Sequence, residues 1–116
     1  MIELVNQLAG NAERCREYVR ICVVAAVVSD ALTFLAAATS EDAVPLDSLY
    51  ETLTATWVPY VKVLKEHRDI AIDIINHAAK HVKVRGEVRN GKISRNGLLL
   101  MASHLDAVRS FLDCVI

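Results

Sequence analysis

Apolar side chains recur at steps of three and four residues along the first third of the chain, which predicts one long helix from Ile2 to Thr39. The first half of this helix is amphipathic, with charged and amide side chains opposite a stripe of Val5, Leu8, Ala12, Cys15, Val19 and Cys22. From Ile21 onward almost every position is apolar. A helix that is apolar on all faces has to be covered on all faces, so this half should lie at the centre of a bundle or in a subunit interface.

The stretch from Ile21 to Ala38 is also long enough to cross a membrane, since it has 18 residues and a single charged side chain, Asp30. Its eight Ile, Val, Leu and Phe residues each favour insertion by roughly 0.3 to 0.6 kcal/mol, whereas a central aspartate costs about 2.5 to 3.5 kcal/mol. Because these contributions nearly cancel, we expect a soluble protein without a membrane partner.

We expect a homodimer with paired first helices, because exposed apolar side chains are costly. The predicted self-association residues are Ile21, Val24, Val28, Leu32 and Leu35.

Shorter apolar stripes predict three further helices. One begins near Pro45, which suits the first turn of a helix, and ends before Pro59; its stripe consists of Leu46, Leu49, Tyr50, Leu53 and Trp57. The next runs from Tyr60 to Val82. The last runs from Leu98 to Val115, with Asn96 as its N-cap and Leu112 in its stripe. The predicted fold class is therefore all-α, a compact bundle of about four helices in a single domain, residues 1–116.

The composition agrees with a helical protein of the cytoplasm. Four Gly and two Pro are few for a loop-rich or all-β chain. The three cysteines are an odd number, and Cys15 and Cys22 lie about 10.5 Å apart along a helix, too far for a disulfide. The third is Cys114. No basic, cleavable signal segment precedes the first helix. We therefore expect reduced thiols and a cytoplasmic location.

The charges are strongly polarised along the chain, although the net charge is only −1. Between positions 80 and 95 six basic residues stand against one acid, Glu87, while the rest of the chain holds seven basic and thirteen acidic residues. The six are Lys80, Lys83, Arg85, Arg89, Lys92 and Arg95. We predict that they bind a partner, a larger protein or complex with an acidic surface. Nucleic acid and a purely solvated segment are the alternatives. No aromatic residue lies between Tyr60 and Phe111, which disfavours stacking on single-stranded bases.

The same segment contains Asn90-Gly91, the strongest short signal for a hairpin turn. Around it, Val82, Val84, Val88 and Ile93 alternate with polar residues. The segment before the last helix is thus either a small β-hairpin or a basic loop. A hairpin of two strands is marginal in water, so it would have to pack on the bundle or pair with another chain.

Asp73, His77 and His81 are each four residues apart and form one row on a helix. Two histidines and a carboxylate in a row can share a divalent metal ion. His104 and Asp106 could join them only if the packing of the last helix brings them there. The histidines also lie along the edge of an apolar stripe, where they would confer pH sensitivity on a helix interface. We favour this second interpretation and predict no metal and no other cofactor.

The sequence contains neither a phosphate-binding glycine loop nor a nucleophile elbow. We therefore predict a non-enzymatic protein–protein interaction module, a small adaptor or inhibitor that docks on a larger assembly through the basic segment. A nucleic-acid-associated regulator that uses the same segment is the alternative. A metal-dependent helical enzyme that uses Asp73, His77 and His81 is the third possibility.

Overall fold

The computed structural model describes the backbone of residues 2–56 and 59–115 and the side chains of residues 16–56 and 59–108. The helices are α1 (Ile2–Ala38), α2 (Leu49–Thr56), α3 (Val61–Glu66), α4 (Arg68–Val84) and α5 (Arg95–Val115). The strands are β1 (Ala43–Pro45), β2 (Val88–Arg89) and β3 (Lys92–Ser94). The predicted side-chain roles of Val5, Leu8, Ala12, Cys15, Trp57, Leu112 and Cys114 fall outside the described side chains.

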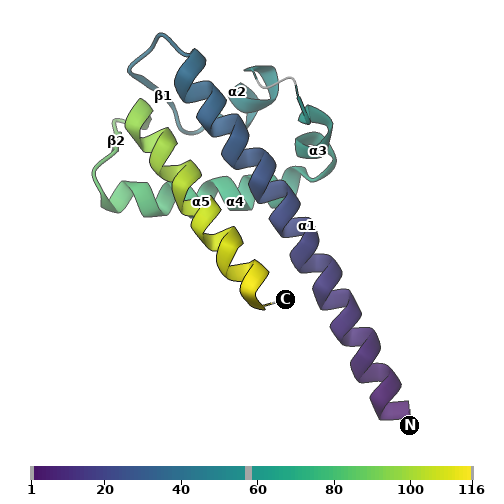
Figure 1. The fold of residues 1–116 in the computed structure, drawn as a ribbon. Coiled ribbons are helices and arrows are strands. Elements are labelled where there is room, and N and C mark those ends of the chain that lie inside the picture. Colours follow the sequence, from purple (N-terminus) through teal and green to yellow (C-terminus); the bar gives the residue numbers. More distant parts are fainter. Residues whose placement is uncertain (1, 57–58, 116) are drawn as a thin grey trace.

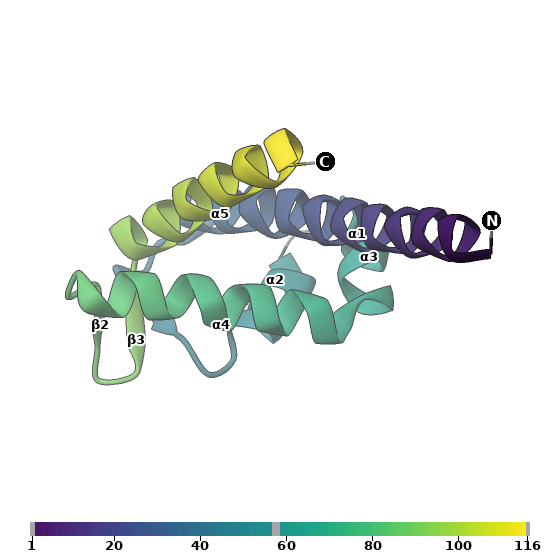
Figure 2. The same ribbon diagram turned by 90° about the horizontal axis from the view of Figure 1, so that it is seen from below.

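The fold is mostly helical, as predicted, with a small three-stranded sheet at one end (Figure 1). Helices α1 and α5 lie side by side and antiparallel, and α4 crosses them in a second layer (Figure 2). Between α1 and α5, the buried Ser29 hydroxyl lies 2.9 Å from the Asp106 carboxylate and 3.2 Å from the Ala102 carbonyl oxygen. A buried hydroxyl needs such acceptors, so these contacts help to fix the position of α5 along α1.

The core fills the space between the two layers. The C-terminal half of α1 supplies one side of it with Val24, Val27, Val28, Ala31, Leu32 and Leu35. The other elements supply Val44, Leu49, Leu53, Leu64, Ala71, Ile75, Ala78, Val82, Ile93, Leu98 and Met101. The apolar half of α1 is therefore covered largely by its own chain.

Four of the five residues predicted for self-association, Val24, Val28, Leu32 and Leu35, belong to this core. Val24, Val28 and Leu32 are inaccessible to solvent. Leu35 is also buried, and Ile21 is half-buried. In this fold the four core residues are not available to a second copy, because other elements cover them, whereas Ile21 lines an open pocket. The large apolar side chains that α1 does expose, among those described, are Val19, Val23 and Phe34. Homodimer formation itself stays a prediction.

Helix α1 extends beyond every other element at its N-terminal end, in both views of the ribbon (Figures 1 and 2). The long axis of the protein measures 60 Å, against 29 and 20 Å for the other two axes. From Arg16 to Ala38 this helix is long and apolar enough to span a membrane, and half of its most apolar stretch is buried in the fold. A core helix of a soluble protein has the same properties, and the cytoplasmic location remains a prediction.

A small β-hairpin and a basic loop were the two alternatives for this segment. The structure has the hairpin, with Asn90 and Gly91 at its turn, and Val82 and Val84 lie in α4 instead of a strand. The φ angles of Asn90 and Gly91, 54° and 73°, are those of a two-residue turn that matches the twist of paired strands. The sheet has the order β1-β3-β2, and both pairings are antiparallel. The third strand, β1, is what the sequence did not indicate. It gives the hairpin the additional packing that two strands need in water.

Pro45 was predicted to open a helix, and the structure places it instead in β1, opposite Lys92. This strand lies at the edge of the sheet, where a residue without an N–H group is tolerated. The next residue, Leu46, donates its N–H to the Gly91 carbonyl at 2.9 Å. Helix α2 therefore begins only at Leu49.

The helix predicted from Tyr60 to Val82 is divided at His67, which has φ −116° and ψ 43°. This division is why the described chain has five helices where about four were expected. The Tyr50 hydroxyl donates to the Leu64 carbonyl at 3.1 Å and so satisfies an acceptor in the last turn of α3. The break allows Leu64 to be buried against α1 while α4 takes its own direction.

Candidate functional site: a basic pocket on the sheet

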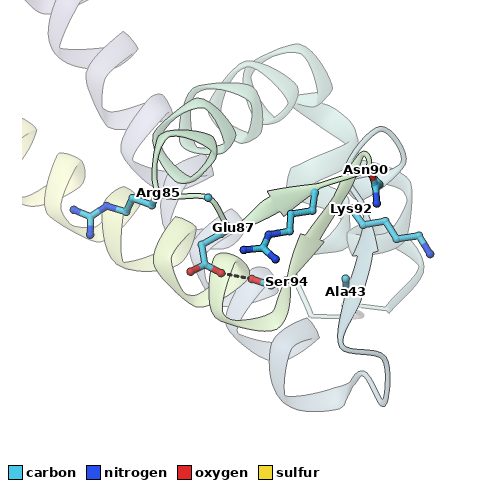
Figure 3. Close-up of a pocket in the computed structure, with 8 residues that line it drawn as sticks. Ala43, Arg85, Glu87, Asn90, Lys92 and Ser94 are labelled. Atoms are coloured by element: carbon cyan, nitrogen blue, oxygen red, sulfur yellow. Dashed lines mark hydrogen bonds between the residues drawn. The ribbon is translucent and has the colours of Figure 1, made fainter.

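The two faces of the sheet have opposite character. Val44 and Ile93 are buried beneath the sheet, and their neighbours along the strands point to the other side. This outer face and the segment that leads into β2 form an open pocket of about 540 Å³ (Figure 3). The pocket is lined by Ala43, Arg85, Gly86, Glu87, Arg89, Asn90, Lys92 and Ser94. We call it the basic pocket.

Three of the six predicted partner-binding residues line the basic pocket, namely Arg85, Arg89 and Lys92. Arg89 and Lys92 are direct partners across β2 and β3, and both are exposed. Like charges placed opposite each other on a sheet repel. Arg85 is the C-cap of α4, and its side chain and that of Lys92 extend to opposite sides of the pocket (Figure 3).

Glu87 is the one acidic residue in the pocket lining. Its carboxylate accepts hydrogen bonds from the Ser94 hydroxyl at 2.5 Å and from the Asn96 side-chain amide at 3.1 Å (Figure 3). These two bonds, Ser94 first, and then the charge of Arg89 lower the pKa of Glu87 from its usual value of 4.5. The carboxylate is therefore ionised at neutral pH, but its oxygens already have partners at the start of α5.

The Ser94 hydroxyl also accepts a hydrogen bond from the Gly97 N–H at 2.9 Å. This is the bond of an N-cap residue, so α5 is capped by Ser94 and begins at Arg95. The prediction of Asn96 as the N-cap was wrong. Asn96 lies in the first turn and binds Glu87 instead.

Arg95 does not belong to the basic pocket. Its guanidinium donates to the carbonyl oxygens of Thr39 at 2.7 Å and Glu41 at 3.3 Å, and its N–H donates to the Asp42 carbonyl at 3.0 Å. Carbonyl groups beyond the last turn of a helix need such donors. Arg95 therefore joins the end of α1 to the start of α5.

Lys80 and Lys83 are exposed on α4 and line a different pocket, together with Asp47 and Asp73. Two acids thus accompany these two lysines. The segment that the sequence presents as one basic site is divided by the fold into a basic pocket, a mixed-charge surface on α4 and a structural arginine.

The predicted row of Asp73, His77 and His81 lies on α4, and the packing of α5 brings His104 to the two histidines. Nε2 of His104 lies 3.3 Å from Nε2 of His77. In the described part of the chain, no three His, Cys, Asp or Glu side chains are arranged to hold a metal ion together. The geometry thus gives no support to the metal-dependent enzyme.

The sequence indicated some residues of the basic pocket and missed others. The charge run pointed to the pocket cations, and Asn90-Gly91 pointed to the turn that pairs Arg89 with Lys92. The contributions of Ala43 and Ser94 to the pocket were missed, because they depend on the pairing of β1 with β3. Comparisons with protein-family models, with curated proteins and with solved structures gave no match to this chain.

Proposed function

We propose that the protein is a non-enzymatic interaction module that binds an acidic segment of a larger protein in its basic pocket. The observation that carries this proposal is the direct pairing of Arg89 with Lys92, two exposed cations held opposite each other on one face of the sheet. Carboxylates of a partner placed between them would relieve this repulsion and form charge-assisted hydrogen bonds.

Glu87 alone does not neutralise the positive charge of the basic pocket. We therefore assign to the pocket an anionic ligand from outside the protein. The Glu87 carboxylate oxygens accept from Ser94 and Asn96, which restricts their direction. Arg85, Arg89 and Lys92 leave the lining with a surplus of positive charge. An adaptor or an inhibitor of a larger assembly needs a surface of this kind and no catalytic group.

An experiment with two matched double variants tests the proposal. Arg89→Ala/Lys92→Ala removes two cations from the pocket, and Lys62→Ala/Lys65→Ala removes two exposed cations from α3. The probe is a fluorescent peptide of ten glutamates, with titrations at low and moderate salt. At about 0.2 to 1 kcal/mol for each exposed ion pair, we expect the pocket variant to bind about tenfold more weakly and the α3 variant to bind like the wild type.

Two results would contradict the proposal. One is equal weakening in both double variants, which would mean that only net charge matters. The other is stronger binding of a single-stranded oligonucleotide than of the peptide at the same salt, lost in the pocket variant. That outcome would favour the nucleic-acid-associated regulator.

A further inference from the structure

Three of the four histidines of the chain meet where α4 packs against α5. His77 and His81 are one turn apart on α4, and His104 reaches them from α5. The His104 ring is stacked on His81, with centroids 4.1 Å apart and 11° between the planes. Its centroid lies 5.3 Å from that of His77, and the two Nε2 atoms are at hydrogen-bond distance. We call these three residues the histidine cluster.

Each of these two contacts needs at least one uncharged ring. A hydrogen bond between two imidazole nitrogens needs one nitrogen as the acceptor, and a protonated imidazole has no acceptor nitrogen. His77 and His104 cannot both be protonated and keep their contact. Stacking two positive rings, as on His81 and His104, is likewise opposed by their charges.

The charges around the cluster act in both directions, since Asp47, which lines a pocket with His77, is negative as well. Arg85, one turn beyond His81 on α4, adds a positive charge on the side of His104. Glu17 of α1 and Asp73 of α4 line a pocket with His77, on the other side of the cluster. On α5, the Asp106 carboxylate is hydrogen-bonded to Ser29 of α1. The remaining cations near His77 are Lys80 and Lys83, which share a second pocket with it.

We propose that the histidine cluster is a proton-sensitive clasp, which holds α4 against α5 while its rings are neutral and weakens that contact when the cluster takes up protons. This clasp does not require the proposed acidic partner. It needs no ligand, and it acts between two helices that both bury core residues.

The direction of the pH dependence follows from His104. Burial, and then the charges of His81, His77 and Arg85, lower the pKa of His104 from its usual value of 6.5. The folded protein therefore binds this proton less readily than the unfolded chain does. The contribution to stability is fully present above pH 6.5, is lost as the pH falls from there to the lowered pKa, and changes no further below it.

The test compares the wild type with His104→Gln and with a control, His67→Gln, which alters the histidine outside the cluster. The urea midpoint of each protein is measured from pH 8 to pH 5.5, and the His104 ring is titrated by NMR. We expect the urea midpoint of the wild type and of the control to decrease as the pH is lowered. In His104→Gln, most of this decrease should be absent. We also expect lower amide protection factors, corrected for the intrinsic exchange rate at each pH, at pH 5.5 than at pH 8 around residues 77–85 and 100–105, and no such change in α2.

The clasp would be overturned by a His104→Gln variant that keeps the full pH dependence, or by a His104 ring that titrates no lower than histidine in the urea-unfolded chain. His81→Gln provides an independent variant in case His104→Gln does not fold. Removal of the stacked ring should raise the pH at which His104 titrates. An unchanged titration would contradict the proposal as well.

Discussion

Glu87 connects three parts of the fold through one carboxylate. It follows the end of α4, lies directly before β2 and accepts hydrogen bonds from the residues that start α5. A carboxylate near the N-terminus of a helix is also stabilised by the helix dipole. The Glu87 side chain therefore holds the basic pocket together and also contributes to its charge.

Glu87 should make the protein sensitive to acid. Because its pKa is lowered in the folded state, its contribution is present above the usual value of 4.5 and is lost as the pH falls through the lowered pKa. We expect Glu87→Gln to flatten the pH dependence of the urea midpoint between pH 5 and pH 3. Glu66→Gln, on the exposed side of α3, is the control. Identical acid limbs for the two variants would refute this role.

Single residues of the pocket show where reading a sequence reaches its limit. Six cations within 16 residues were recognisable as a concentration of charge. The direction of each side chain was not recognisable from the sequence, because it depends on where α4 ends and on which strands pair. Arg89 and Arg95 look alike in the sequence, yet Arg89 faces a pocket and Arg95 binds the carbonyl groups that follow α1.

Gly97 makes the close approach of α5 to the hairpin possible. A Cβ atom at this position would lie 2.7 Å from Cγ1 of the buried Ile93 and 3.1 Å from Cβ of Glu87. Alanine favours a helix by about 1 kcal/mol over glycine, whereas forcing an extra methyl into a packed contact costs about 1 to 3 kcal/mol. We therefore predict that Gly97→Ala destabilises the fold by about 1 kcal/mol.

Chemical denaturation of Gly97→Ala, with Ser103→Ala as the control, would measure this balance. Ser103 is exposed in the same helix, and its replacement should change the free energy of unfolding by no more than about 0.5 kcal/mol. A more stable Gly97→Ala variant would mean that the hairpin can move away from α5 at no cost.

The elements that were predicted well are those with a local cause. The three-four spacing defined α1 to within one residue at its C-terminal end, and Asn90-Gly91 marked the turn of the hairpin, which was one of two alternatives for that segment. The elements that differ have tertiary causes. Pro45 pairs with a strand almost 50 residues away, and the break at His67 accompanies a hydrogen bond from Tyr50. The residues around Pro45 do not indicate its partner strand, and the residues around His67 do not indicate the contact with Tyr50.

At the scale of the whole molecule, α1 has two roles. Its C-terminal half is the centre of the fold, and its N-terminal half extends past it (Figure 1). Val23 and Val24 are neighbours in sequence but differ fully in environment, since Val23 is 49% exposed and Val24 is inaccessible. Substitutions at these two positions can therefore test the predicted dimer and the core independently.

We expect the wild type to be a dimer in light scattering, and Val23→Asp to be a folded monomer with its free energy of unfolding changed by about 1 kcal/mol or less. Val24→Asp should instead unfold the protein, because a buried unpaired charge costs several kcal/mol out of a typical total of 5 to 15. A monomeric wild type would remove the homodimer. A folded Val24→Asp would contradict the assignment of this residue to the core.

Arg85 belongs to the lining of the basic pocket and also acts on the charge of His104. An anion in the pocket would offset the charge of Arg85 and make His104 easier to protonate. By thermodynamic reciprocity, a proton on His104 would then increase the affinity of the pocket for that anion by the same factor. If the basic pocket binds an acidic partner as proposed, Arg85 at the end of α4 would couple that binding to the protonation of His104.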